Sequence, residues 1–516
     1  MVAMLTVQAK AAQPADAVLL AYKDVMTLSS SDRYNARYLW VSVESKEEKW
    51  GAFVAASGNL NALSIRSRLL APTIILADGT PKTWQEMTDK DWPQLTLLRV
   101  DISCYGWSPI IWDKLGDPAL EPLFHVYTVV PYPAGRYVNG TTYPAGEEKT
   151  IAIAPWLLRP LPLLQDDPQY ATAAIQLCIE CGYAQCPILE ADNFVWQSSI
   201  QFDRKAGYYD FNGIKDLKSF DKLVAFDERQ SVAYAQPRRE AVAKSGVANE
   251  PRLIEFFEKI GGKYIRTKDQ VNQRGQGNRN ALNLANVEGE FKFDAFEIYA
   301  SGANGFWKKG LFDSQGTRQD SAPDGVGYHH QSLTNDGKIH VNLTCDSCHD
   351  RMPGNGGLQP FKPYYRNKYA APGPLALPSP YKKNVDLEEQ ILSKIDTTGE
   401  QQRYAAAVFE VTGQTPDIYS RELLASFYRW DQHLTLKLAA QRFGVTPTEM
   451  VRAFDHYKTT FGRIDTVNDN WLLAKERRSE IGVNQWAEFY NFGQLMLRGL
   501  PTWSIDLRKK YPTKPR

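Results

Sequence analysis

The sequence predicts a multi-domain α+β fold whose C-terminal region is mainly helical. The chain has 516 residues, more than the roughly 100 to 200 of a usual domain, so several packed units are expected. Helical apolar spacing over residues 15–28 and 46–70 alternates with a run from Leu95 to Ile102 that is typical of a buried strand. This mixture of periodicities indicates an N-terminal α+β domain.

The middle of the chain carries further helix and strand signals. Pro-rich stretches around 131–144 and 155–168 interrupt regular structure, and two helical stretches are expected near 215–225 and 250–259. A Gly/Asn/Gln-rich segment at 269–287 is typical of an exposed loop.

A β-hairpin is predicted after that loop. Glu297–Tyr299 and Phe306–Phe312 have strand character, and Asn304–Gly305 between them is a strong turn signal.

In the C-terminal third, a predicted loop is followed by predicted helices. Residues 353–380 are rich in Gly and Pro, whereas Asp386 with Glu389 forms a capping box before an apolar run. A second helix start is predicted at Thr446–Glu449, where Pro447 would take the first helical position.

Charge and hydropathy exclude two classes of partner. The chain has 60 basic and 59 acidic residues and a net charge of +1. It therefore has no strong positive electrostatic field that would attract nucleic acid. No run of about 18 apolar residues occurs, so no membrane span is expected.

One motif carries recognisable chemistry, Cys345-Asp346-Ser347-Cys348-His349. Covalent attachment of a c-type haem needs two thiols about one helical turn apart, each adding to a vinyl group, and an imidazole next to the second thiol to coordinate iron. The motif therefore predicts one haem c, with thioethers at Cys345 and Cys348 and His349 as the proximal iron ligand.

Other chemistries of a Cys-x-x-Cys pair were weighed against haem. A zinc site could combine Cys345 and Cys348 with Cys178 and Cys181, but zinc does not require the adjacent His349. A thioredoxin-like pair belongs at a helix start after a parallel strand, which the flanking residues do not resemble. A plain disulfide within the pair is the third alternative.

Haem of this type is attached outside the cytoplasm, so the motif predicts a periplasmic or otherwise exported protein. Residues 1–13, a short apolar stretch followed by small residues, match the end of a signal peptide. In an oxidising compartment we expect disulfides among the remaining cysteines, centred on residues 178–186, with a second metal site as the alternative. These cysteines are Cys104, Cys178, Cys181 and Cys186.

The second axial ligand of the iron separates electron transfer from ligand binding. Met352 is too close to His349 to reach the opposite face. Met450 and His330 are the preferred candidates. The others are His329, His340, His433, His456 and Met496.

These signals divide the chain into five segments. They are a signal-peptide remnant (1–13), an N-terminal α+β domain (14–160), a Cys-containing connecting region (161–248), a haem-binding cytochrome c-like domain (249–380) and a helical C-terminal region (381–516).

Three functions are compatible with this reading. The preferred function is electron transfer with an unidentified redox partner protein, because one haem exchanges one electron at a time. A peroxidase- or oxidase-like haem enzyme with an open distal position comes next, since the chain is far longer than a carrier needs. A haem-based binding or sensing protein is the third.

Short motifs in a fixed order also carry a resemblance that covers most of the chain. They are Arg37-Tyr38-Leu39, Leu98-Arg99-Val100-Asp101, Tyr105-Gly106-Trp107, Ala191-Asp192-Asn193-Phe194, Tyr208-Tyr209-Asp210-Phe211, Ser245-Gly246-Val247, Glu297-Ile298, Asn304-Gly305, Gly316-Thr317-Arg318 and Ala322-Pro323. Together with the haem motif, this order resembles the large single-haem c-type cytochromes of planctomycetes and some predatory bacteria. The resemblance implies haem and export, and no particular substrate.

Two departures from that family stand out. The family usually has a His where this chain reads Glu255-Phe256-Phe257, so a residue able to serve the haem is missing there. Residues 165–188, with their cysteines, resemble an insertion.

Overall fold

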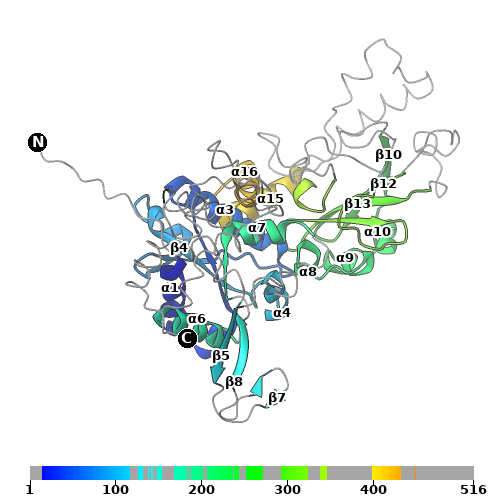
Figure 1. The fold of residues 1–516 in the computed structure, drawn as a ribbon. Helices are drawn as coiled ribbons and strands as arrows, with labels where there is room; N and C mark the ends of the chain where they lie inside the picture. Colours follow the sequence, from blue (N-terminus) through cyan, green and yellow to red (C-terminus); the bar gives the residue numbers. More distant parts are fainter. Residues whose placement is uncertain are drawn as a thin grey trace, which may run out of the picture. The chain divides into compact units, whose positions relative to one another are not determined.

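The computed structural model of the chain describes residues 14–116, 126–131, 137–138, 141–142, 148–153, 168–182, 184, 187–201, 206–235, 237–242, 252–270, 292–323, 338–345, 398–431 and 448. Helices and mixed or antiparallel sheets give these residues an α+β fold (Figure 1). Two compact units are present. The first contains Met1–Ala56, Ala71–Trp196 and Ala425–Arg516, and the second contains Ser57–Leu70 and Gln197–Leu424.

The first unit is built on a mixed five-stranded sheet of order β3-β2-β4-β1-β9. β1 pairs antiparallel with β4, placing Tyr38 opposite Arg99, and parallel with β9, placing Tyr38 opposite Ile188. The strands of the unit are β1 (Ala36–Trp40), β2 (Thr73–Leu76), β3 (Pro81–Lys82), β4 (Leu95–Asp101), β5 (Val126–Pro131), β6 (Tyr137–Val138), β7 (Thr141–Thr142), β8 (Glu148–Ile153) and β9 (Ile188–Glu190).

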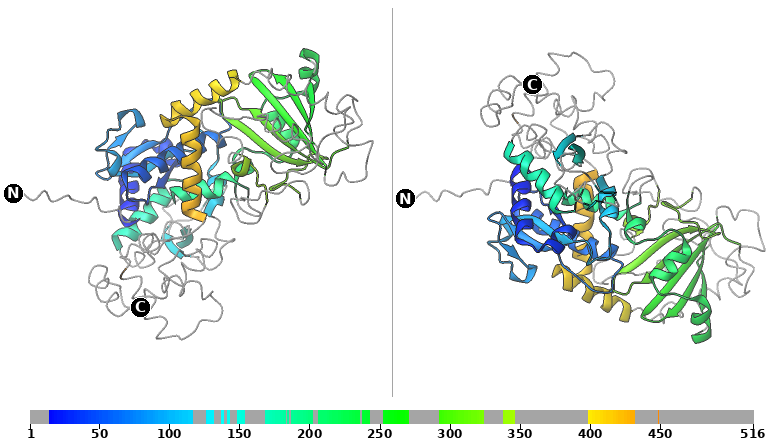
Figure 2. Two further views of the ribbon diagram at one scale, coloured as in Figure 1. Left: turned by 90° about the horizontal axis from the view of Figure 1, so that it is seen from above. Right: turned by 90° about the horizontal axis from the view of Figure 1, so that it is seen from below.

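Helices cover this sheet. The α-helices are α1 (Pro14–Thr27), α2 (Ser30–Asn35), α4 (Pro109–Asp113) and α6 (Pro168–Glu180), and the 3-10 helices are η1 (Trp84–Glu86), η2 (Trp92–Gln94) and η3 (Lys114–Gly116). α3 (Lys46–Leu63) and α7 (Ala191–Ser199) begin in the first unit, and their C-terminal ends belong to the second. α1 packs against α6 and β1, and their apolar faces form one buried cluster with β2 and β4. Figure 2 shows the same elements from above and below.

A buried polar contact ties α1 to the sheet. Asp24 accepts a hydrogen bond from the hydroxyl of Tyr38 at 2.7 Å and pairs with Nη1 of Arg99 at 2.8 Å. Since buried charges must be paired to be tolerated, this contact sets the position of α1 along the sheet.

The second unit is built on an antiparallel meander of order β10-β11-β12-β13-β14. Its strands are β10 (Arg238–Val242), β11 (Arg252–Lys259), β12 (Gly262–Asp269), β13 (Ala295–Ser301) and β14 (Trp307–Asp313). Its helices are α8 (Tyr208–Phe211), α9 (Leu217–Leu223), α10 (Glu228–Tyr234), α15 (Thr398–Thr412) and the first part of α16 (Pro416–Asp431), whose residues from Ala425 belong to the first unit. α10 packs against β11.

Aromatic side chains fill the space between the meander and its helices. The rings of Phe226 and Tyr264 stack at 3.6 Å, and Phe257 meets both edge-on. Phe220 contacts Tyr264 and Phe312 in the same way. These large buried rings supply much of the apolar area that holds the sheet and helices together.

Several predicted elements are confirmed. The helices expected at 15–28 and near 215–225 correspond to α1 and α9, and the strand expected from Leu95 is β4. The helix expected over 46–70 is α3, which ends earlier, at Leu63. The predicted hairpin is β13 and β14, which pair from Ala295–Asp313 to Ser301–Trp307 around Asn304–Gly305.

The helix predicted near 250–259 is wrong, because this segment is strand β11. Leu253, Ile254 and Phe257 have spacing that also suits a helix face. The decisive residue is Glu255, which is fully buried and paired with Arg266 and Lys268 of the neighbouring strand β12. The two partners of Glu255 lie on another strand, outside the stretch of sequence whose apolar periodicity predicted the helix. Periodicity could therefore not predict these ion pairs.

Other predictions lie outside the described residues, among them the signal-peptide remnant 1–13, most of the loop 269–287, the loop 353–380 and the helix starts at Asp386 and Thr446. Residues of the expected connecting region 161–248 occur in both units: β9 joins the first sheet, whereas α8, α9 and α10 belong to the second. Among the helices that the structure describes, none is both long and apolar enough to cross a bilayer.

Candidate functional site

The first cysteine of the haem motif, Cys345, lies in the second unit, at the end of a short described segment. Residues 343–345 are helical, and Asn342 before them has φ 68°. Asn is one of the few side chains that tolerates this left-handed conformation. Its Nδ2 donates to the carbonyl of Ser199 at 2.8 Å, so the turn that leads into Cys345 is held from the protein interior.

The thiol of Cys345 faces a carboxylate. Its Sγ donates to Oε1 of Glu297 at 3.3 Å, and the hydroxyl of Tyr299 donates to the same oxygen at 2.9 Å. Cys345 is only 3% exposed. Burial raises the pKa of the Cys345 thiol well above its usual value, and the charge of Glu297 raises it further. Cys345 is therefore held as a neutral thiol.

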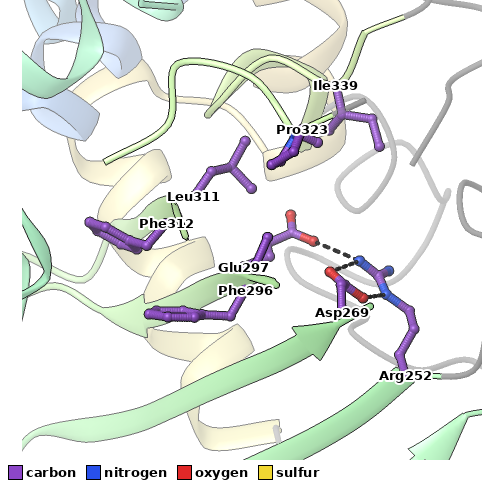
Figure 3. A pocket seen from close by; sticks show the side chains of 10 residues that line it. Arg252, Asp269, Phe296, Glu297, Leu311, Phe312, Pro323 and Ile339 are labelled. Carbon is purple, nitrogen blue, oxygen red and sulfur yellow. Dashed lines mark hydrogen bonds and ion pairs between the residues drawn. The ribbon is translucent and has the colours of Figure 1, made fainter. Parts of the chain in front are cut away.

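Glu297 is in turn near an ion pair at the ends of the strands. Arg252 of β11 binds Asp269 of β12 with both Nε and Nη2, and the Nη2 to Oδ2 distance is 2.7 Å. Nη2 of Arg252 also lies 3.8 Å from Oε2 of Glu297, so the guanidinium bridges two carboxylates (Figure 3). Burial raises the pKa of Asp269, while Arg252 opposes the rise.

A small cavity of about 20 Å³ adjoins these groups. Arg252, Asp269 and Glu297 are the charged residues at its wall, and the remainder is apolar (Figure 3). The apolar lining consists of Ala295, Phe296, Leu311, Phe312, Ala322, Pro323 and Ile339. This volume suits one water molecule. Sites for larger organic ligands occupy roughly 300 to 1,000 Å³, so the cavity is not itself a haem pocket.

Cys345 is the one residue of the motif that the structure describes. It carries a free thiol, the group that thioether formation needs, and the residues that lead into it are helical. This thiol is only 3% exposed and faces Glu297. Within the described ranges no group of three or more His, Cys, Asp or Glu side chains is arranged to hold a metal ion.

Most residues predicted for haem binding lie outside the described part of the chain. These are Cys348 and His349 of the motif, the preferred distal candidates Met450 and His330, and also Met496, His329, His433 and His456. His340 is described: it is half-buried and forms an isolated β-bridge with Ser321.

The other cysteines belong to the first unit. Cys178 and Cys181 are buried free thiols at the end of α6, and Cys104 is a half-buried thiol whose Sγ donates to Oδ2 of Asp101 at 3.3 Å. Burial raises the pKa of Cys178, and it raises the pKa of Cys181 to about 12. Cys186 lies outside the described residues, so the predicted disulfides of this cluster stay a prediction.

Arg252, Asp269 and Tyr299 were not anticipated as site residues, and Glu297 was anticipated only as part of a strand. The sequence does contain a signal for two of these residues. Glu297 lies between the apolar residues Phe296 and Ile298, and Asp269 is the last residue of a strand that is otherwise largely buried. A charge at the end of a mostly buried strand needs a partner. The identity of that partner depends on strand register.

Comparison with known proteins finds no matching family model, no matching curated protein and no matching solved structure.

Proposed function

We propose that this protein is an exported c-type cytochrome that transfers electrons through one covalently attached haem. Cys345 and Cys348 would form the thioethers, and His349 would bind the iron. The structural observation that supports the proposal is the state of Cys345: a free thiol, preceded by helical residues and fixed by a hydrogen bond to Glu297. Helical residues three apart lie on one face, as attachment through both cysteines requires.

The chain's own residues would position the attachment point. Asn342 fixes the turn before Cys345, and Glu297 with Tyr299 orients its sulfur. When bound, haem supplies a one-electron couple whose potential depends on its axial ligands and the surrounding charges. The buried charges of Arg252, Asp269 and Glu297 are of the kind that tune such a potential.

One observation favours a second candidate, a haem enzyme. The water-sized cavity is lined by Asp269 and Glu297, and the pKa of Asp269 is raised by burial. Carboxyl groups with perturbed pKa values beside a cavity are typical of sites that move protons. An enzyme would use such groups to move protons, a role that electron transfer alone does not require.

The proposal is tested by producing the full chain behind a secretion signal in a host that attaches c-type haem. We expect one covalent haem by intact mass, with a low-spin absorption spectrum for a carrier or a high-spin, ligand-binding spectrum for an enzyme. Cys345→Ala and Cys348→Ala should each reduce covalent attachment, and His349→Ala should change the spectrum.

Cys104→Ala is the matched control, because it removes a half-buried thiol of the first unit and should leave haem loading unchanged. A secreted, folded wild-type chain without covalent haem would contradict the proposal. So would full native spectra in all three motif variants.

A further inference from the structure

The contact between Glu297 and Cys345 has a function of its own. Thiols react with disulfides through the thiolate, so a thiol kept protonated resists oxidation. An exported chain meets oxidants before its cysteines are used, and a cysteine lost to a disulfide cannot form a thioether. A group that raises the pKa of the attachment cysteine therefore lowers its rate of oxidation, because less thiolate is present.

Glu297 is placed to do this. It lies on β13 with Oε1 3.3 Å from Sγ of Cys345, and it is held from two sides, by the hydroxyl of Tyr299 and by the guanidinium of Arg252. A carboxylate has only acceptor atoms, so the thiol must be the donor of this hydrogen bond.

The other groups that face Cys345 are known. The hydroxyl of Tyr299 favours the thiolate, because it can turn its one proton from Glu297 to the sulfur. The ammonium of Lys309 on β14 favours the thiolate as well. Burial and the charge of Glu297 favour the thiol, and they outweigh the other two. Tyr208 and Tyr209 also feel the charge of Cys345, and both are themselves held neutral by burial.

We propose that Glu297 is a positioning residue that holds Cys345 as a hydrogen-bonded thiol and so protects it from oxidation until haem is attached. The inference rests on the proposed function for its purpose, but the contact can be tested without haem. The reaction to be slowed is attack of the Cys345 thiolate on a disulfide. A new sulfur–sulfur bond forms, the old one breaks, and the departing thiolate takes up the proton that Cys345 has lost.

The experiment uses the haem-free full chain with Cys348→Ala, so that Cys345 is the only cysteine of the motif. Oxidised glutathione is the probe, and peptide mass spectrometry follows the mixed disulfide at Cys345 over the neutral and alkaline range. Glu297→Gln removes the charge at nearly constant size. It should shift the profile to lower pH and speed modification severalfold at neutral pH, because a lower thiol pKa raises the thiolate population.

Tyr299→Phe separates this role from loss of structure. It removes a hydrogen bond that favours the thiolate, so modification should slow, the opposite of the Glu297→Gln effect. Glu255→Gln is the matched control, because Glu255 is a buried glutamate of β11 whose partners are Arg266 and Lys268. It should leave the Cys345 profile unchanged.

Equal profiles for Glu297→Gln and the unsubstituted residue would overturn the inference. Faster modification in both Glu297→Gln and Tyr299→Phe would also overturn it, since general loosening would then be the cause. If the thiol results hold but the wild-type chain takes up no haem, the proposed function fails and the role of Glu297 at the sulfur stands.

Discussion

The ammonium nitrogen of Lys308 lies 2.7 Å from Oδ1 of Asn212 inside the second unit, where each residue is only 2% exposed. The same nitrogen donates to the carbonyls of Ala62 at 2.6 Å and Ser64 at 2.8 Å, at the C-terminal end of α3. One side chain thus joins β14, α3 and the residue after α8. Three acceptors match the three protons of an ammonium group.

Replacing Lys308 with Met should destabilise the second unit by about 3 kcal/mol or more, because buried acceptors lose their donor at about 1 to 3 kcal/mol each. Urea denaturation at neutral pH measures the change. Lys222→Met of α9 offers a comparison: Lys222 is exposed, so its loss should cost less. An equal or smaller cost for Lys308→Met would contradict this account.

The same lysine predicts a pH dependence. Burial lowers the pKa of Lys308 to about 7 from an ordinary value of 10.5. Between these pH values the unfolded chain binds more protons, so the free energy of unfolding rises with pH across that window. The stability that deprotonation of Lys308 contributes is fully present above about pH 10.5 and fully lost below about pH 7. The gap between wild type and Lys308→Met should therefore widen from pH 7 to 10, and parallel curves would refute the prediction.

Asp269→Asn should destabilise the meander strongly. The substitution leaves the guanidinium of Arg252 with Glu297 at 3.8 Å as its nearest acidic partner among the described contacts. Breaking one side of a buried ion pair costs about 3 to 5 kcal/mol. The joint replacement Arg252→Met with Asp269→Leu should cost less than Asp269→Asn alone, as measured by thermal denaturation. A larger loss in the double variant would show that the pair is not the cause.

Two glycines should respond oppositely to Ala. A methyl group on Gly58 of α3 would overlap the ring of Tyr419, which is buried, whereas one on Gly399 of α15 would meet nothing within 4 Å. Overpacking costs about 1 to 3 kcal/mol, so Gly58→Ala should lower the melting temperature. Gly399→Ala should raise stability by about 0.5 kcal/mol through helix propensity and reduced freedom of the unfolded chain. A neutral Gly58→Ala would mean that the ring of Tyr419 moves aside.

Cys178 and Cys181 should react with a thiol reagent only after the first unit unfolds. Both thiols are buried and their pKa values are raised, whereas Cys104 is half-buried. Timed alkylation with peptide mapping should label Cys104 first. Alkylation of the denatured but unreduced chain then tests the predicted disulfides, because a bonded cysteine stays unlabelled until a reductant is added.

The sequence alone determined the elements whose information is local. α1, α3, β4 and the β13–β14 hairpin follow from apolar periodicity and from the Asn304–Gly305 turn. The prediction of haem and export also rests on local information, because Cys345, Cys348 and His349 all lie within one stretch of five residues. Such signals need no knowledge of distant neighbours.

Only the tertiary structure decided what surrounds Cys345. Glu297 is 48 residues away in the chain, and Arg252 and Asp269 reach it because β11, β12 and β13 pair in one register. The strand at 252–259 was mistaken for a helix for the same reason: the partners that allow Glu255 to be buried lie on β12. Whether a charged residue lies inside or outside depends on which opposite charge the fold places beside it, and that placement is set by strand register and not by local sequence.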